Sequence, residues 1–188
     1  MRHEPTIPLF LWVATAALAH ILWGGGAEEV VGVDRSSATI AFAREHGRPE
    51  RGVELLNTDE LVRAPPRAFD LCYSNGVFHH IQPGERAAAL RTIRDALAPG
   101  GHLFLWENHP GNPGTRYIMA RCAFDDDAVP LWPHQTRRLL REGGFDVVKT
   151  GYRFLFPRPL AFLRPLERRL LTLPIGAQYV VVGRRASG

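Results

Sequence analysis

The chain has 188 residues, and 45% of them are hydrophobic, so we expect one globular domain over 1–188 and exclude a disordered protein. The formal net charge of +4 is a small basic excess, which an ordinary solvated surface explains. Cys72 and Cys122 stand far apart and in no metal-binding spacing, which excludes a disulfide framework and favours a cytoplasmic protein.

The N-terminal part contains a long apolar run over residues 7–23, which has the length of a short membrane span or a signal peptide. Two features argue against both interpretations. His20 interrupts the apolar run, and Glu4 reduces the positive charge of the residues before the run, which a signal peptide needs. The run also leads directly into an α/β pattern whose first strand it has to supply. We therefore expect a strand over 7–12, a helix over 16–23 and no stable membrane insertion.

Short apolar segments alternate with helical patterns along the rest of the chain. The predicted strands are 28–34, 52–57, 69–75, 102–107, 145–152 and 177–185. The predicted helices are 36–47, 83–101 and 134–144. This alternation predicts a doubly wound, mostly parallel sheet, with the last two strands paired as a terminal hairpin.

Two segments do not fit the alternation. Residues 108–133, rich in Pro, Gly and Asn at their start, follow a strand, and ligands in such sheets bind beyond the carboxyl ends of strands, so we expect them to cover a site. Residues 153–176 mix bulky apolar residues with five arginines. They predict either a basic amphipathic helix in weak contact with an anionic membrane surface, or a helix packed on the sheet with its arginines outward. The prolines in this segment argue against a membrane helix, because proline interrupts helices.

Polar residues follow two of the predicted strands. Asp34 ends the strand 28–34, where a carboxylate can accept hydrogen bonds from both hydroxyls of a ribose; the alternative is a helix cap before Ser36. The segment 57–61, "NTDEL", follows the next strand and could face an adenine amine, although Asn and Asp also favour ordinary turns.

The stretch 69–81, "FDLCYSNGVFHHI", carries the strongest signal. A buried strand ends in polar residues and a glycine turn, and His79 and His80 follow. A histidine near a strand end can act as a general base; the alternative is that one imidazole packs or caps and the other is solvated. Since no third histidine or carboxylate stands at a ligand spacing, the sequence predicts no metal.

Together the motifs resemble the class I S-adenosylmethionine-dependent methyltransferases, in particular their methyltransferase domain 11 group. The segments "VVGVDRS", "FDLCYSNGVFHHI" and "LRTIRDALAPGGHLFLWE" occur in that family's order and spacing, and the resemblance covers about 7–150. It implies a Rossmann-like sheet of seven strands, mostly parallel with an antiparallel last strand, and S-adenosyl-L-methionine as cofactor. The residues it places at the cofactor are Asp34 at the ribose, Asp59 or Thr58 at the adenine, and Ser74, Asn75 and Gly76 at the methionine part and the acceptor.

One part of the family pattern is missing. The glycine-rich turn after the first strand falls on 13–17, where Val13, Ala14 and Thr15 begin the sequence "VATAA". Glycines matter there because the backbone turns sharply beside the cofactor. Three explanations are open: a working loop of small residues, a degenerate non-catalytic relative, or a frame or start error in the first twenty residues. We favour the third, because the rest of the pattern is intact.

The resemblance implies methyl transfer to a small-molecule acceptor, including a lipid- or sugar-linked one. Where the acceptor loses a proton, the candidate bases are His80, His79 and His109. Arg116 and Arg121 could bind an anionic acceptor, or pair with the acidic run 125–127.

Three other functions compete with methyl transfer. The alternative is a non-catalytic methyltransferase-like binding module without a working cofactor loop. An NAD-dependent oxidoreductase is disfavoured because no Tyr-x-x-x-Lys occurs, and the turn 74–76, Ser-Asn-Gly, disfavours a nucleic-acid methyltransferase.

Overall fold

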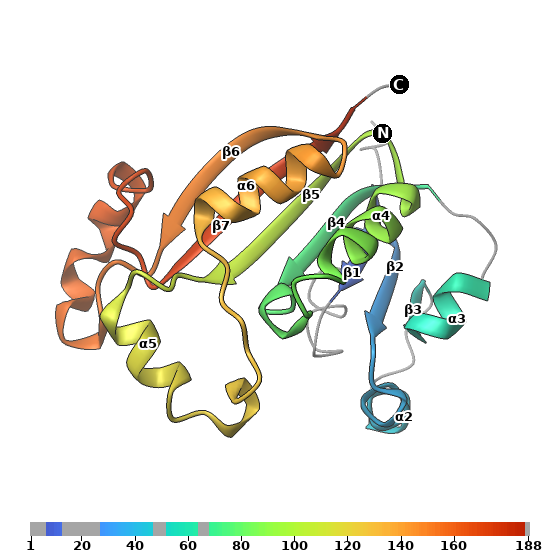
Figure 1. Ribbon diagram of the computed structural model, residues 1–188, viewed down its shortest axis with the longest axis horizontal. Helices are drawn as coiled ribbons and strands as arrows, with labels where there is room; N and C mark the ends of the chain where they lie inside the picture. Colours follow the sequence, from blue (N-terminus) through green and yellow to red (C-terminus); the bar gives the residue numbers. More distant parts are fainter. Residues whose placement is uncertain (1–6, 13–26, 47–51, 64–67, 187–188) are drawn as a thin grey trace, which may run out of the picture.

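The computed structural model describes residues 7–12, 27–46, 52–63 and 68–186. Seven strands form one sheet in the order β3-β2-β1-β4-β5-β7-β6 (Figure 1). The strands are β1 (Ile7–Trp12), β2 (Ala27–Asp34), β3 (Val53–Asn57), β4 (Phe69–Asn75), β5 (Leu97–Asn108), β6 (Phe145–Arg153) and β7 (Gln178–Arg185). β7 runs antiparallel to both of its neighbours, and the other pairings are parallel. The predicted fold class and the pairing of the last two strands are confirmed.

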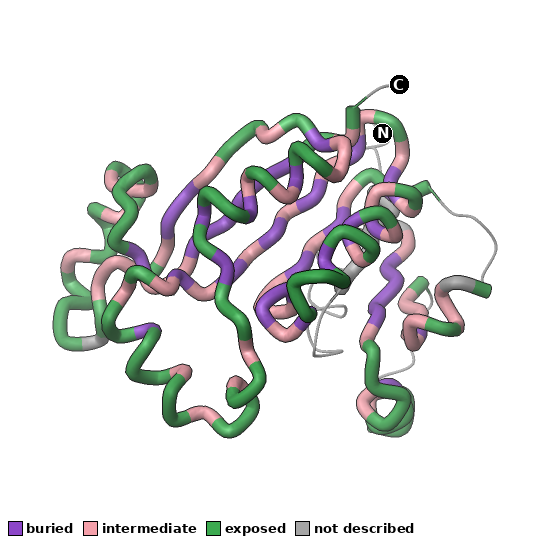
Figure 2. Tube along the Cα trace, in the orientation of Figure 1, coloured by how far each residue is buried: buried purple, intermediate pink, exposed green. Residues whose placement is uncertain are grey.

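The main core lies between the sheet and the helices α4 (Arg86–Ala96) and α6 (Pro133–Glu142), which lie over the same face (Figure 1). Leu90 and Leu140 are fully buried in these helices, as are Leu103 and Leu105 in β5. Alternate residues of β5 are buried because successive side chains point to opposite faces of a strand. Figure 2 shows the resulting band of buried positions along the central strands.

The helix predicted over 83–101 is shorter than expected. α4 ends at Ala96, and Leu97–Gly101 already belong to β5. Gly100 has φ +81°, and a Cβ on Gly101 would lie 2.9 Å from the carbonyl oxygen of Ala98, so this bend requires glycine. Two more helices, α2 (Ser37–His46) and α3 (Thr58–Arg63), follow β2 and β3. The helix predicted over 16–23 lies outside the described residues.

The two irregular segments both contain short helices at the end of the sheet where β5 and β6 finish (Figure 1). Residues 108–133, which we call the cover segment, form α5 (Pro113–Met119) and the 3₁₀ turn η2 (Ala123–Asp125). Residues 153–176 contain the 3₁₀ segment η3 (Arg158–Arg169), which is broken at Leu160. This break excludes one continuous helix over the segment, and Phe162 of η3, which is 74% exposed, is not packed on the sheet. None of the helices in the described ranges has the length and apolarity that crossing a membrane requires.

Candidate functional site

The parallel strands β2, β3, β4 and β5 end at one edge of the sheet. Asp34 at the end of β2 pairs in register with Asn57 at the end of β3, and Asn75 of β4 pairs with Trp106 of β5. The predicted site residues at 34, 58, 59 and 74–76 therefore share one edge, where ligands bind in sheets of this kind. Val13, Ala14 and Thr15 lie outside the described residues.

Asp34 keeps one carboxylate oxygen available. Its Oδ1 accepts a hydrogen bond from the Ser36 backbone N–H at 2.7 Å, and its Oδ2 has no hydrogen-bond partner in the described part of the chain. The cap of α2 is provided by Ser36, whose Oγ accepts from the Thr39 N–H at 3.1 Å. Asp34 thus shapes the turn but is not the cap that the alternative interpretation required.

The end of β3 shows ordinary helix-capping chemistry. The Asn57 side chain accepts from the Glu60 N–H, and the Glu60 carboxylate accepts from the Asn57 N–H, both at 2.8 Å. The hydrogen bond from Asn57 and the neighbouring Arg44 lower the pKa of Glu60. Thr58 and Asp59 form the first turn of α3 beside this pair, and Asp59 is exposed.

The end of β4 contains a buried polar atom without a partner. Ser74 is fully buried, and its Oγ has no hydrogen-bond partner among the described residues, a costly state for a hydroxyl unless a further group satisfies it. Asn75 is half-buried beside it. Gly76 follows with φ +65°, and its N–H donates to the Trp106 carbonyl at 2.9 Å. This left-handed turn directs the chain into the 3₁₀ turn η1 (Phe78–His80).

The two histidines of η1 meet two carboxylates from distant parts of the chain. His79 is 3% exposed, and its Nδ1–H donates to Oε2 of Glu107, which is 1% exposed, at 2.5 Å. The Nε2 atoms of His79 and His80 lie 3.5 and 3.6 Å from Oδ1 of Asp125 in η2. Burial opposes protonation of His79, but the hydrogen bond and charge of Glu107, with Asp125, outweigh it and raise the pKa of this imidazole.

A buried arginine ties η1 to the cover segment. The Arg86 Nε donates to the carbonyls of Phe78 and Ile81, and its Nη2 donates to the Val129 carbonyl at 2.5 Å. The Val129 N–H in turn donates to the His79 carbonyl at 2.7 Å. Burial lowers the pKa of Arg86, which the charge of Glu107 partly offsets. The cover segment is therefore fixed where it returns past the histidines.

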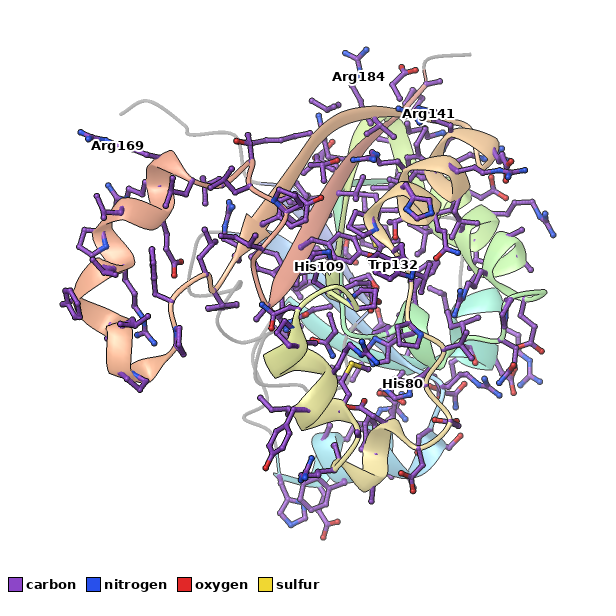
Figure 3. The ribbon with its side chains drawn as sticks, turned by 60° about the vertical axis from the view of Figure 1, so that its left-hand side comes forward. His80, His109, Trp132, Arg141, Arg169 and Arg184 are labelled. Atoms are coloured by element: carbon purple, nitrogen blue, oxygen red, sulfur yellow. The ribbon has the colours of Figure 1, made fainter. Side chains whose placement is uncertain are left out.

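His109 lies outside this cluster. It is 4% exposed, and its Nδ1–H donates to the Gly176 carbonyl at 3.0 Å. The rings of Tyr152 and Tyr179 pack around it, and Figure 3 shows it near Trp132, away from His80. The structure thus brings together His79 and His80 but gives His109 the contacts of a buried structural residue.

The cover segment forms an open cavity of about 610 Å³, lined by residues including Arg116, Asp125 and Trp132. The guanidinium of Arg121 lies instead over the Tyr117 ring, 3.6 Å from its centre. Within the described residues, neither arginine pairs with the acidic run 125–127, whose contacts go to the histidines. Arg116 is therefore placed to meet a ligand in the cavity, and Arg121 is not.

Sequence reasoning missed Glu107 and Asp125. Glu107 occupies a position in β5 where the alternation of buried residues predicts an apolar side chain. An acidic residue at a buried position of a strand was the signal that could have identified it. Asp125 lies 45 positions after His80 along the chain, and no local spacing connects the two.

Comparisons with known proteins agree with this architecture. A family model described as a methyltransferase domain matches residues 13–103. The chain is 36% identical over 104 residues to a carboxy-S-adenosyl-L-methionine synthase of Pseudomonas syringae, covering 52% of this chain and 41% of that protein. It is 24% identical over 118 residues to a ubiquinone biosynthesis O-methyltransferase of Marinobacter nauticus, covering 60% of this chain and 48% of that protein.

The fold is also found in solved structures. An S-adenosylmethionine-dependent methyltransferase from Mesorhizobium loti superimposes with a TM-score of 0.70 at 22% identity, covering 98% of this chain and 94% of that one. The alignments span less than half the length of the two curated relatives. The chain therefore has the fold of S-adenosylmethionine-dependent methyltransferases, and its residues 13–103 match a methyltransferase-domain model.

Proposed function

We propose that this protein binds S-adenosyl-L-methionine and transfers its methyl group to a small-molecule acceptor. The observation that carries the proposal is the buried Ser74 Oγ, which has no hydrogen-bond partner among the described residues and lies at the same sheet edge as the Asp34 carboxylate. Both belong to residues at the carboxyl ends of parallel strands, where a nucleotide-like cofactor sits in this fold.

The residues present fit this cofactor. Asp34 would accept a hydrogen bond from a ribose hydroxyl, Thr58 and Asp59 would flank the adenine, and Ser74, Asn75 and Gly76 would contact the methionine part. Val13, Ala14 and Thr15 would supply the remaining loop. When bound, S-adenosyl-L-methionine supplies an electrophilic methyl group on a sulfonium.

The acceptor would occupy the cavity under the cover segment. Arg116 at its wall favours an acceptor with a carboxylate or phosphate, since a guanidinium binds such groups through two parallel hydrogen bonds. Phe162 and Leu166, both exposed on η3 at the same end of the sheet, add apolar surface beside arginines, which supports a lipid- or sugar-linked acceptor and weak contact with a membrane surface. One relative acts in ubiquinone biosynthesis, which agrees with an apolar acceptor.

The chain's own contribution to the reaction is orientation and proton removal. The anchored cover segment would exclude water and hold the acceptor in line with the methyl group. Where the acceptor loses a proton, the cluster of His79 and His80 would receive it, directly or through a group bound there. His109 is the weaker candidate because both its burial and its hydrogen bond to Gly176 restrain it.

Calorimetric titration with S-adenosylmethionine and S-adenosylhomocysteine tests the proposal. We expect micromolar binding, weakened about 10- to 100-fold by Asp34→Asn, because a hydrogen bond to a charged group contributes about 1.5–3 kcal/mol. The matched control is Asp70→Asn, an exposed aspartate near the opposite end of β4, which should bind like the unaltered protein. Equal loss in both variants, or none in either, would contradict the site.

The alternative is a binding module without turnover, and the loop at 13–17 distinguishes the two. If the unaltered chain does not bind the cofactor, the titration is repeated with Val13→Gly, Thr15→Gly and Ala17→Gly combined. Restored binding would place the defect in this loop and leave the rest of the site valid. No binding in either protein would favour the non-catalytic module.

A further inference from the structure

Two histidines and an aspartate place three potential metal ligands together. Nitrogen atoms of His79 and His80 and an oxygen of Asp125 all lie within 4.8 Å of one another. We propose that these three side chains bind a divalent transition-metal ion, with zinc as the reference ion. The spacing of the histidines in the sequence predicts no metal, and the fold adds the third ligand through the cover segment.

The distances within the cluster suit zinc. Oδ1 of Asp125 lies 3.5 Å from Nε2 of His79 and 3.6 Å from Nε2 of His80. Tetrahedral zinc with bonds of about 2.0–2.1 Å separates its ligands by about 3.3–3.4 Å, so both oxygen–nitrogen separations are within a few tenths of an ångström of a zinc site. The third separation, between the two histidine nitrogens, is at most 4.8 Å. Both oxygen–nitrogen separations exceed the usual range of a direct hydrogen bond, about 2.7–3.2 Å. The oxygen is therefore spaced as a co-ligand of the two nitrogens.

The surroundings of each imidazole match those of a metal ligand. Nδ1 of His79 is held by Glu107 at 2.5 Å, and Nδ1 of His80 faces Asp127 at 3.3 Å. Metal-binding histidines characteristically donate their other N–H to a carboxylate, which fixes the tautomer and aims the free nitrogen at the ion. Here Glu107 holds the Nδ1–H of His79 in this way, and Asp127 faces the Nδ1 of His80 at the longer distance. This leaves the Nε2 atom of each imidazole on the side of Asp125.

His80 provides a second, independent observation. Its Nε2 is buried and has no hydrogen-bond partner in the part of the chain that the structure describes, although an imidazole nitrogen buried in this way normally has one. A metal ion would satisfy this atom. Two imidazoles with one carboxylate favour zinc and similar transition metals over calcium and magnesium, which prefer oxygen ligands.

The ion would link two parts of the chain and border the acceptor cavity. Asp125 belongs to η2 and also lines the cavity, whereas both histidines belong to η1. Three protein ligands leave a fourth position for water or for an acceptor oxygen, the arrangement of catalytic zinc sites. This last role rests on the proposed function: the ion would lower the pKa of an acceptor hydroxyl, whose proton would pass to solvent water, so that no free histidine base is needed.

The experiment titrates the untagged full-length protein with Zn²⁺ against a chromophoric chelator, and with Co²⁺ followed by visible absorption. We expect one equivalent of tight binding and a Co²⁺ spectrum of tetrahedral type. His80→Ala and Asp125→Asn should each weaken binding about 100-fold or more, and Glu107→Gln about 10- to 100-fold. His46→Ala removes an exposed histidine of α2 and should change nothing.

Three results would overturn the proposal. The first is that the protein fails to compete with the chelator for Zn²⁺. The second is that His80→Ala and Asp125→Asn leave Zn²⁺ affinity unchanged, and the third is that His46→Ala weakens it as much as those two variants do. Circular dichroism of each variant shows whether it folds, and Asp125→Asn, which keeps the side-chain shape, maintains the test if His80→Ala unfolds. Cofactor binding is measured separately in EDTA, so that failure of the metal site and failure of the proposed function are distinguishable.

Discussion

Arg86 offers the sharpest test of how the site is held together. Its guanidinium donates to the carbonyls of Phe78 and Ile81 at 3.2 and 2.9 Å and to Val129 at 2.5 Å. Arg86→Met keeps the apolar stem and removes every donor. Hydrogen bonds to a charged group contribute about 1.5–3 kcal/mol each, but the substitution also relieves the desolvation of a buried cation. We expect a net loss of about 3 kcal/mol in the free energy of unfolding.

Thermal and urea denaturation followed by circular dichroism measures this loss. For a chain of this size, 3 kcal/mol corresponds to a fall in Tm of about 6–12 °C. Because Val129 loses its donor, limited proteolysis should also cleave the cover segment sooner. The matched control, Arg91→Met, alters an exposed arginine of the same helix and should change stability by less than about 0.5 kcal/mol. A loss in Arg86→Met no larger than in the control would refute the reasoning.

Three further predictions concern the core and the turn beside the site. Tyr179→Phe removes the hydroxyl that donates to the Leu131 carbonyl at 2.9 Å, and urea denaturation should show a loss of about 1–2 kcal/mol; an unchanged midpoint would contradict it. Gly76→Ala places a side chain at φ +65°, and should cost about 1–2 kcal/mol in the same assay, with cofactor affinity lowered as well. Burial raises the pKa of the Cys72 thiol, so a thiol reagent should modify only the half-buried Cys122 in the native protein and both in urea; fast labelling of two thiols without urea would refute this.

The sheet was predictable because its signals are local. Buried parallel strands are short apolar runs bounded by turn residues, and "FDLCYSN" forms β4 with the expected bounds, 69–75. The expected helix over 83–101 was too long because "LAPGG" resembles a helix end. Leu97 instead pairs with Phe69, and a register shift follows before Leu71 meets His102. The start of β5 is set by its pairing with β4, so the sequence around Leu97 contains no local pattern that predicts it.

The site was predictable only in part, for a similar reason. The strand-end residues Asp34 and Ser74 follow from topology, because parallel strands end at one edge. The partners of the histidines do not, since Glu107 comes from the neighbouring strand and Asp125 from a cover segment without periodicity. Even there one local signal existed: Asn112 before Pro113 is a capping residue followed by a favoured first helical residue, and α5 begins there.

The cover segment is anchored to the chain around β7 and to α4 by hydrogen bonds near its two ends. At its start, the Thr115 hydroxyl donates to the Ala177 carbonyl and Asn112 donates to Ile175, which tie α5 to the chain just before β7. At its end, Leu131 is held by Tyr179, and Val129 by Arg86.

The intervening residues 116–128 carry part of the cavity lining, including Arg116 and Asp125, together with exposed side chains such as Tyr117, Ile118 and Phe124. Anchors at both ends allow this stretch to change sequence or move without disturbing the sheet. Acceptor choice should therefore reside in 116–128, and a metal ion on Asp125 would add a third anchor at its centre. Substitutions within the stretch should alter which acceptor binds while leaving cofactor affinity unchanged, and a coupled loss of both would show that cover segment and cofactor site are one unit.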